Sequence, residues 1–251
     1  MKNLILLVSI FCSIYMTSCA QNTQHFEGKQ IEFKSVDGLL ITADIYEIED
    51  KNAPLIILFH QAGFSRGEYR EIAPKLNKLG FRCLAIDQRS GEGVNGVVNE
   101  TNKRALEENK ATEYIHALPD LEAAVSYSKS ELKANKIIIW GSSYSAALVM
   151  YLGAKYKNDI AGILAFSPGE YFKIGNQTFS SYASGITRPV FISSSKKEQS
   201  SWQAIYDAIP GEKYFYLPES EGFHGSRALW KSKEGNEACW KAVTEFLVRI
   251  K

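Results

Sequence analysis

Short, uninterrupted apolar runs alternate along the chain with longer segments in which apolar residues recur every three or four positions. The short runs are typical of strands that are buried on both faces of a sheet, and the longer segments are typical of amphipathic helices. The expected strands cover residues 54–59, 81–86, 137–140, 160–166, 189–192 and 213–217. The expected helices cover residues 68–79, 111–131, 144–155, 199–209 and 238–250. This alternation predicts an α/β fold with a mostly parallel sheet and helices on both faces.

The beginning of the domain has a different pattern. Residues 30–35 and 39–48 alternate between apolar and polar positions, and Asp37-Gly38 separates them, which predicts an antiparallel hairpin. With the hairpin, the sheet has about eight strands. Residues 94–110 and 171–187 show no strong period, so we expect loops over the carboxyl edge of the sheet, too short for a large lid. In parallel sheets of this kind, ligands bind at that edge.

The N-terminus has the pattern of a bacterial lipoprotein signal. A positively charged start and an apolar stretch over residues 4–16 lead to Met16-Thr-Ser-Cys19. We expect cleavage before Cys19, a lipid on this cysteine, a tether over residues 19–28 and one domain over residues 29–251. The protein would then lie in the bacterial cell envelope, anchored through the lipid alone and facing the periplasm or the surface. The alternatives are a signal peptide that is cut without lipidation and a short membrane anchor.

Composition narrows the function classes. The 251 residues carry a formal net charge of +1 and no basic run, which argues against a nucleic-acid partner. Beyond the signal and Cys19, the cysteines are Cys83 in an expected strand and Cys239 in the last expected helix. An exported protein could oxidise these two cysteines, but we expect two buried thiols. Their spacing does not suggest a metal site. The sequence leaves the oligomeric state open.

The junction after the strand at residues 137–140 carries the strongest chemical signal. It reads Gly141-Ser-Ser-Tyr-Ser145 and leads directly into a helix. A strand that turns sharply into a helix at a serine forms a nucleophile elbow, which exposes the hydroxyl at the top of the sheet. Of the competing serines, only Ser143 follows a glycine by two positions at the strand end, so Ser143 is the candidate nucleophile. The structural alternative is an ordinary turn whose serines cap the helix.

A serine nucleophile needs a base, and the base needs a carboxylate that orients it. His224 lies in a glycine-flanked loop after the last strand, from which it can reach Ser143. Glu198 follows the preceding strand and is the candidate acid, although an acidic residue is also favoured there as a helix cap. Glu170 and Glu221 compete with it for this role.

The oxyanion of the expected intermediate needs two backbone N–H donors. One donor comes from Tyr144, the residue after the candidate nucleophile. The other comes from the loop after residue 59, from Ala62 or from Gln61. The structural alternative for this loop is a plain turn. Gln61 and Glu170, which both follow strand ends, are the candidate substrate contacts.

Four motifs in this order resemble the α/β-hydrolases, and among them the dienelactone-hydrolase-like esterases. The motifs are His60-Gln-Ala-Gly63, Asp87-Gln-Arg-Ser-Gly91, Gly141-Ser-Ser-Tyr-Ser145 and Gly222-Phe-His-Gly225. The resemblance implies acyl-enzyme chemistry on a small ester substrate, with a triad of Ser143, an acid and His224 and without a cofactor. It also implies that Asp87 and Arg89 brace the site. Arg66 could meet an anionic group of a substrate, but we interpret it as a brace of its loop. Three residues depart from the usual pattern, namely Ser145 for glycine, Gln61 for glycine and Glu198 for aspartate.

Two function classes remain. The first is a lipid-anchored serine hydrolase acting on carboxylic esters, which include acyl groups on carbohydrate. A small serine peptidase is a weaker form of it, because the chain has no added domain that selects peptides. The second is a non-catalytic ligand-binding protein on the same fold. A hydrogen bond between Ser143 and His224 would favour the enzyme, whereas a site filled by Phe223 or Tyr144 would favour the binder.

Overall fold

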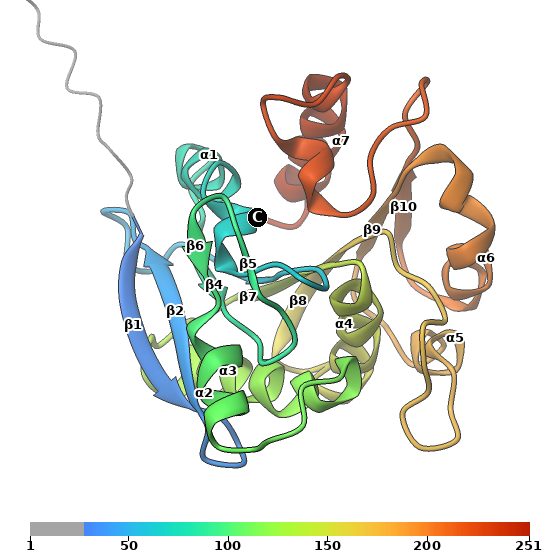
Figure 1. Cartoon of the computed structure of the whole chain (residues 1–251). Coiled ribbons are helices and arrows are strands. Elements are labelled where there is room, and N and C mark those ends of the chain that lie inside the picture. The colour runs from blue at the N-terminus through green and yellow to red at the C-terminus, as the bar shows by residue number, and fades with distance from the viewer. Residues whose placement is uncertain (1–27) are drawn as a thin grey trace, which may run out of the picture.

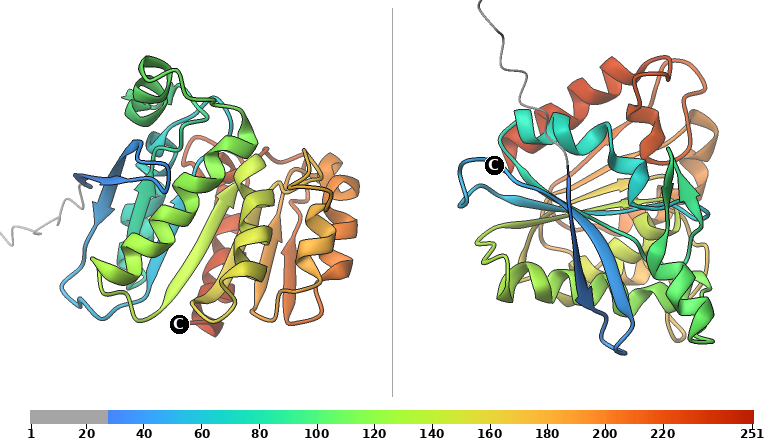
Figure 2. Two further views of the ribbon diagram at one scale, coloured as in Figure 1. Left: turned by 90° about the horizontal axis from the view of Figure 1, so that it is seen from below. Right: turned by 60° about the vertical axis from the view of Figure 1, so that its left-hand side comes forward.

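The computed structural model describes residues 28–251. The expected signal, Cys19 and nearly all of the tether lie outside the described residues. The described part has three layers, with a twisted central sheet between two layers of helices (Figures 1 and 2). Within these residues, no helix combines the length and the apolar character needed to cross a bilayer.

The central sheet has eight strands in the order β1-β2-β4-β3-β7-β8-β9-β10. The strands are β1 (Lys29–Lys34), β2 (Leu40–Tyr46), β3 (Leu55–Phe59), β4 (Arg82–Ile86), β7 (Ile137–Ser142), β8 (Ile160–Phe166), β9 (Val190–Ser193) and β10 (Lys213–Tyr216). β2 pairs antiparallel with both β1 and β4, and every other pair is parallel. β3, β4 and β7 are buried along their whole length, as expected for continuous apolar strands under helices on both faces. The predicted fold class is therefore confirmed.

Helices cover both faces of the sheet. The α-helices are α1 (Ile72–Lys78), α2 (Glu100–Glu107), α3 (Leu118–Ser130), α4 (Tyr144–Lys155), α5 (Phe179–Ala183), α6 (Gln199–Ala208) and α7 (Asn236–Arg249). The described residues also contain four short 3₁₀ helices, η1 (Arg66–Tyr69), η2 (Tyr114–Ala117), η3 (Lys196–Glu198) and η4 (Ser226–Leu229). One core layer contains residues of α3, α4, α5 and α6, and the opposite core layer contains residues of α1 and α7. Figure 2 shows the two helical layers on opposite sides of the sheet.

The helix expected over residues 68–79 is interrupted. The 3₁₀ turn η1 comes first, and α1 begins only at Ile72. Pro74 accounts for this start. In a helix that began several residues earlier, the Pro74 ring would collide with the carbonyl group of the residue four positions before it. In the first turn the missing N–H of proline costs nothing.

Two segments expected to be loops contain regular structure. Residues 94–110 hold most of a small hairpin, β5 (Gly93–Val94) with β6 (Val97–Val98), and then α2. Asn99 caps α2 by accepting from the Asn102 N–H, and only Thr101 and Ala105 of the helix are buried, so its buried face is narrow. Residues 171–187 contain α5, which Thr178 caps.

The two cysteines within the described residues lie in separate elements. Cys83 is in β4 and Cys239 is in α7, and both are free and buried, as expected. Burial raises the pKa of each thiol, that of Cys239 to about 12.

Candidate active site

The elbow between β7 and α4 holds Ser143 in a strained conformation. Its φ of 59° and ψ of −122° lie outside the regions that residues with a side chain normally occupy. The turn is tight enough that an ideal Cβ on Gly141 would lie 2.3 Å from the Ser145 carbonyl oxygen. Glycine is therefore required at position 141. The expected elbow is present, and it places Ser143 at the carboxyl edge of the sheet.

Ser145, which replaces the usual glycine, forms part of a buried network. Its hydroxyl donates to the His60 carbonyl oxygen at 2.6 Å and accepts from Nε2 of Gln88 at 2.6 Å. His60 follows β3 and Gln88 follows β4, so this hydroxyl joins the first turn of α4 to the ends of two neighbouring strands. A glycine at this position would remove both of these bonds, and it would leave the Gln88 amide with the Tyr144 hydroxyl at 2.9 Å and the His60 carbonyl oxygen with the Gln88 amide at 3.3 Å.

Three side chains from different loops form a continuous chain of hydrogen bonds. Nε2 of His224 lies 2.8 Å from Oγ of Ser143, and its Nδ1 lies 2.5 Å from Oε1 of Glu198. Glu198 belongs to η3 after β9, and His224 belongs to the loop after β10. With the imidazole proton on Nδ1, the histidine donates to the carboxylate and its Nε2 is free to accept the serine proton.

The second oxygen of Glu198 is also occupied. Oε2 accepts from the Ser167 hydroxyl at 2.8 Å and from the Ser195 N–H at 3.0 Å. Burial alone would raise the pKa of Glu198, but these hydrogen bonds and the bond with His224 lower it to about 2. Ser167, directly after β8, also accepts the Gly225 N–H at 2.9 Å and so holds the loop beside His224. The sequence analysis missed Ser167.

The competing carboxylates lie elsewhere. Both oxygens of Glu170 accept backbone N–H groups at the start of α5, from Phe179 at 2.7 Å and Ser180 at 2.8 Å. The expectation that Glu170 contacts substrate is therefore replaced by a capping role, which suits an acidic side chain at a helix N-terminus. The side chain of Glu221 is exposed. Within residues 28–251, neither carboxylate forms a hydrogen bond with His224.

The candidate oxyanion donors differ in whether their N–H groups already have a partner. The Gln61 N–H donates to Oε2 of Glu68 at 2.8 Å, so it is already engaged. Among the described residues, no group accepts from the N–H of Ala62 or of Tyr144. Tyr144 is the first residue of α4, where the helix dipole favours negative charge. The arrangement therefore favours Ala62 over Gln61 as the first donor.

Gln61 has a different position from the one expected of a substrate contact. Its side chain is 8% exposed and its Oε1 is buried without a hydrogen-bond partner. This oxygen lies against Gly225, where an ideal Cβ would come within 2.4 Å of it. Gly225 has a φ of +70°, so glycine is needed there both for the backbone and for the approach of this amide.

A comparison of the sequence with models of protein families also indicates a hydrolase. Residues 50–203 match the family model described as serine aminopeptidase, S33. The chain belongs to this family. The match covers both β3 with its following loop and the elbow, so the family assigns the described domain to the hydrolases of the α/β-hydrolase type. A search of curated proteins gave no significant match.

Solved structures with the same fold are distant in sequence from this S33-family hydrolase. A dienelactone hydrolase from Anabaena variabilis has a TM-score of 0.71 at 11% identity, covering 90% of this chain and 99% of its own. An esterase from Pyrococcus furiosus has a TM-score of 0.66 at 20% identity, covering 90% and 93%. Est1E from Butyrivibrio proteoclasticus, solved with ferulic acid, has a TM-score of 0.67 at 15% identity, covering 88% and 98%. These likenesses show the fold.

Beneath the site, the S33-family chain contains a buried carboxyl group that sequence reasoning missed. Glu68 is 0% exposed, and burial raises its pKa to about 7. Its Oε2 accepts from Gln61, and its Oε1 accepts from the Ser142 hydroxyl at 2.7 Å, which in turn accepts the Ser226 N–H at 2.9 Å. Glu68 therefore links the loop after β3, the elbow strand and the loop after His224.

His60 does not act as a second base in this arrangement. It is 0% exposed, and burial lowers its pKa to about 4. Its Nε2 accepts from the Gln88 N–H at 3.1 Å, and its Nδ1 lies 2.8 Å from the Gln61 carbonyl oxygen. A neutral ring with the proton on Nδ1 satisfies both bonds, so His60 shapes the loop as a structural residue.

The charged residues interpreted as braces form buried ion pairs. Arg66 pairs with Asp87 at 2.6 Å and with Asp44 at 2.9 Å. Arg89 pairs with Asp120 at 2.7 Å. These pairs fix the loops after β3 and β4 and leave the arginines engaged within the protein.

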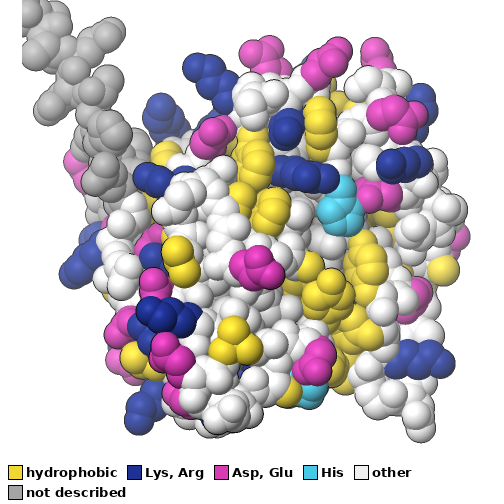
Figure 3. Space-filling model, viewed as in Figure 1, with side chains coloured by type: hydrophobic (Ala, Val, Ile, Leu, Met, Phe, Trp, Pro, Cys, Tyr) yellow, Lys and Arg dark blue, Asp and Glu magenta, His cyan; other side chains and the backbone are white. Residues whose placement is uncertain are grey.

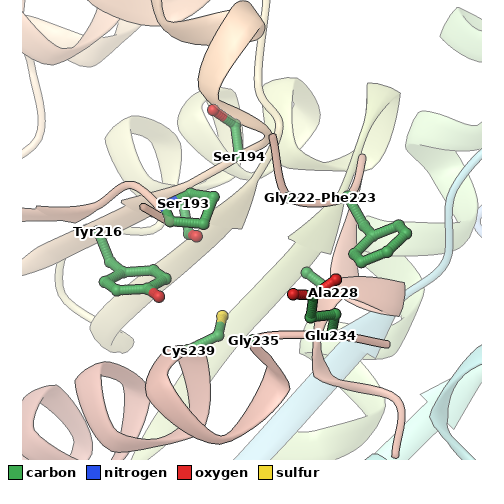
Figure 4. Close-up of a pocket in the computed structure, with 10 residues that line it drawn as sticks. Ser193, Ser194, Tyr216, Gly222, Phe223, Ala228, Glu234, Gly235 and Cys239 are labelled. Atoms are coloured by element: carbon green, nitrogen blue, oxygen red, sulfur yellow. The ribbon is translucent and has the colours of Figure 1, made fainter. Parts of the chain in front are cut away.

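Phe223 lines a small cavity whose walls do not include Ser143. Figure 4 shows it lining a small cavity behind the His224 loop, opposite Tyr216 and the sulfur of Cys239. The Tyr144 ring is buried, and its hydroxyl accepts from Nε2 of Gln88 at 2.9 Å. Neither aromatic residue therefore fills the site in the way that a binding module would require.

Proposed function

We propose that the chain is a serine hydrolase that cleaves carboxylic esters through an acyl-enzyme, with Ser143 as nucleophile, His224 as base and Glu198 as acid. The observation that carries this proposal is the hydrogen-bonded chain of 2.8 Å and 2.5 Å through these three side chains. The esterase from Pyrococcus furiosus with the same fold lends support to ester substrates.

The proposed reaction has two halves. In the first, Nε2 of His224 takes the proton of Ser143 while Oγ attacks the ester carbonyl carbon, and the oxyanion accepts from the N–H groups of Ala62 and Tyr144. The tetrahedral intermediate collapses, and His224 gives the proton to the departing alcohol. In the second half a water molecule loses a proton to His224 and attacks the acyl-enzyme, which releases the carboxylic acid and restores the serine hydroxyl. Glu198 stays ionised and stabilises the imidazolium, in keeping with its pKa of about 2.

Labelling with a fluorophosphonate probe tests the activated serine. The full-length chain in mild detergent is expected to label, and Ser143→Ala and His224→Ala are expected to remove the label. His116→Ala is the matched control, because His116 is a surface histidine that pairs with Glu113. A folded wild type that does not label would favour the non-catalytic binding protein. Labelling that survives Ser143→Ala would assign the nucleophile to another serine.

A serine peptidase is the second candidate, because the family is described as serine aminopeptidase. The two reactions share the acyl-enzyme and differ in the leaving group. Parallel assays with p-nitrophenyl esters and aminoacyl p-nitroanilides separate them. We expect turnover of the esters with little turnover of the anilides, and the reverse preference would make peptide bonds the substrate.

We also propose that the mature chain is held at the cell envelope by a lipid on Cys19. This proposal rests on the sequence pattern of residues 1–19 alone. Cys19→Ala is expected to move the protein from the membrane fraction to the soluble fraction. A variant that stays with the membrane without the lipid would favour an uncleaved anchor.

A further inference from the structure

Two tyrosine rings around the candidate site remain exposed to solvent although each packs against a neighbouring group. Tyr114 and Tyr171 each retain 43% of their accessible surface. The Tyr114 ring stacks on the buried ring of Tyr144, with centroids 4.7 Å apart and planes 17° apart. Tyr144 directly follows Ser143, so the Tyr144–Tyr114 stack begins next to the candidate nucleophile, and 43% of the Tyr114 surface stays accessible.

Tyr171 is held in place beside the candidate nucleophile. Its hydroxyl donates to the Ser167 carbonyl oxygen at 2.7 Å, and its side chain approaches that of Ser143. The ring lies over Gly169, where an ideal Cβ would be 3.2 Å from Cζ of the tyrosine. Glycine therefore allows the ring to lie flat over the backbone, and the opposite face of the ring supplies the exposed surface.

Phe172 extends this surface. Its ring is tilted 47° from that of Tyr114 at a centroid distance of 6.3 Å, and it packs edge-on against the buried Phe179 at 5.0 Å. We call Tyr114, Tyr171 and Phe172 the aromatic wall. On the face seen in Figure 3, hydrophobic side chains gather in a band next to a histidine. Exposed apolar surface that gathers beside a site marks a place for a ligand.

The aromatic wall and the segment that follows His224 pack on different core layers. Phe172 packs on the core layer of α3, α4, α5 and α6, and Tyr114 stacks on Tyr144 of that layer. The loop of His224 leads into η4 and α7, which belong to the other layer. In the proposed reaction His224 protonates the departing alcohol, so the alcohol leaves on the side of α7. The acyl group then extends toward the aromatic wall.

We propose that the aromatic wall is the acyl subsite and that it receives a planar aromatic ring carried by the acid part of the ester. The inference rests on the proposed function. The reaction is ester hydrolysis, in which water supplies the oxygen of the released aryl-substituted acid and the proton of the released alcohol. Planar rings suit this surface because offset stacking and edge-to-face contacts stabilise aromatic pairs beyond the burial of their area.

The test compares two esters that have the same carbon skeleton and similar intrinsic reactivity, methyl phenylacetate and methyl cyclohexylacetate. The wild type is expected to hydrolyse the aromatic ester with a kcat/KM about three- to tenfold higher. In Tyr114→Leu, which keeps apolar volume and removes the ring, this ratio is expected to fall to about one. Phe215→Leu is the matched control, because Phe215 is another exposed aromatic residue, 51% exposed on β10, and is expected to keep the wild-type ratio.

The outcomes separate the two proposals. Equal hydrolysis of both esters by a wild type that labels with fluorophosphonate overturns the aromatic subsite and leaves the hydrolase intact. A preference for benzyl acetate over cyclohexylmethyl acetate, without one between the methyl esters, overturns the acyl placement. A ratio that falls equally in Phe215→Leu shows that the wall has no special role. Failure of every ester together with failure of labelling overturns the hydrolase, and the subsite with it. Thermal unfolding of Tyr114→Leu near that of wild type verifies that the variant folds.

Discussion

Replacing Glu68 with glutamine tests how the buried network beneath the site responds to pH. Glu68 is 0% exposed, and burial raises its pKa from 4.5 to about 7 in the folded protein. Glutamine has nearly the same shape and retains a carbonyl oxygen that accepts from the Gln61 N–H. It does not titrate, so the variant removes the ionisation while keeping most of the packing.

The direction in which stability changes with pH follows from the pKa of Glu68 in the unfolded and in the folded chain. Below pH 4.5 the carboxyl is protonated in both states and has no effect on the pH dependence. Between pH 4.5 and about 7 the unfolded chain loses the proton first, so the free energy of unfolding of the wild type falls as the pH rises. Above pH 7 both states are ionised and the decrease is complete. A pKa of about 7 against 4.5 corresponds to about 3 kcal/mol.

Urea unfolding of wild type and Glu68→Gln at several pH values between 4 and 8 measures this effect. The difference in free energy of unfolding, variant minus wild type, is expected to rise by about 3 kcal/mol over this range, because the contribution of every other group cancels. Glu107→Gln, the same change on an exposed position of α2, is the control. A difference that stays constant with pH for Glu68→Gln would refute the reasoning, since it would mean that the carboxyl ionises alike in both states.

Three further substitutions have distinct expected effects. Glu198→Gln is expected to lower kcat about 10³- to 10⁴-fold with a nearly unchanged fold, because the amide cannot hold His224 in the required tautomer. Ester hydrolysis measures kcat, and circular dichroism verifies the fold. A loss of kcat below tenfold would assign the acid to another residue. Ser145→Ala is expected to lower the free energy of unfolding by about 1–3 kcal/mol, because the two buried hydrogen bonds of the Ser145 hydroxyl are lost. Urea unfolding measures this, and an unchanged midpoint would contradict it. Gly141→Ala is expected to prevent folding, because the added Cβ would lie 2.3 Å from the nearest backbone atom. Soluble expression of this variant with a native circular dichroism spectrum would contradict the prediction.

The parts of the fold that were predictable from sequence are those that local patterns encode. Continuous apolar runs mark strands buried on both faces, and the small residues around Ser143 mark a tight elbow, so each could be located without knowledge of the partners. Helices α2 and α5 escaped prediction because they are short and mostly polar, and capping by Asn99 and Thr178 stabilises them rather than a long apolar face.

The site could be predicted only in part, for a similar reason. Ser143 and His224 have local signatures, whereas the choice among three glutamates depends on how loops meet in space. The structure brings Glu198 to His224 and uses Glu170 to cap α5. Glu68 has no local signature at all, because a glutamate on an expected helix normally faces solvent.

The proposed chemistry and the proposed specificity depend on different parts of the protein. In the proposed mechanism, buried and partly buried hydrogen bonds between strand ends hold the network around Ser143, His224 and Glu198, so a change in these bonds should alter turnover of every substrate alike. The aromatic wall comes from segments outside the strands and meets the site through ring contacts alone, apart from the Tyr171 hydroxyl. Substitutions in the wall should therefore change the ratio between substrates while the pH dependence of turnover stays the same. Substitutions in the network should do the reverse, and a variant set that failed to separate in this way would place the wall within the catalytic network.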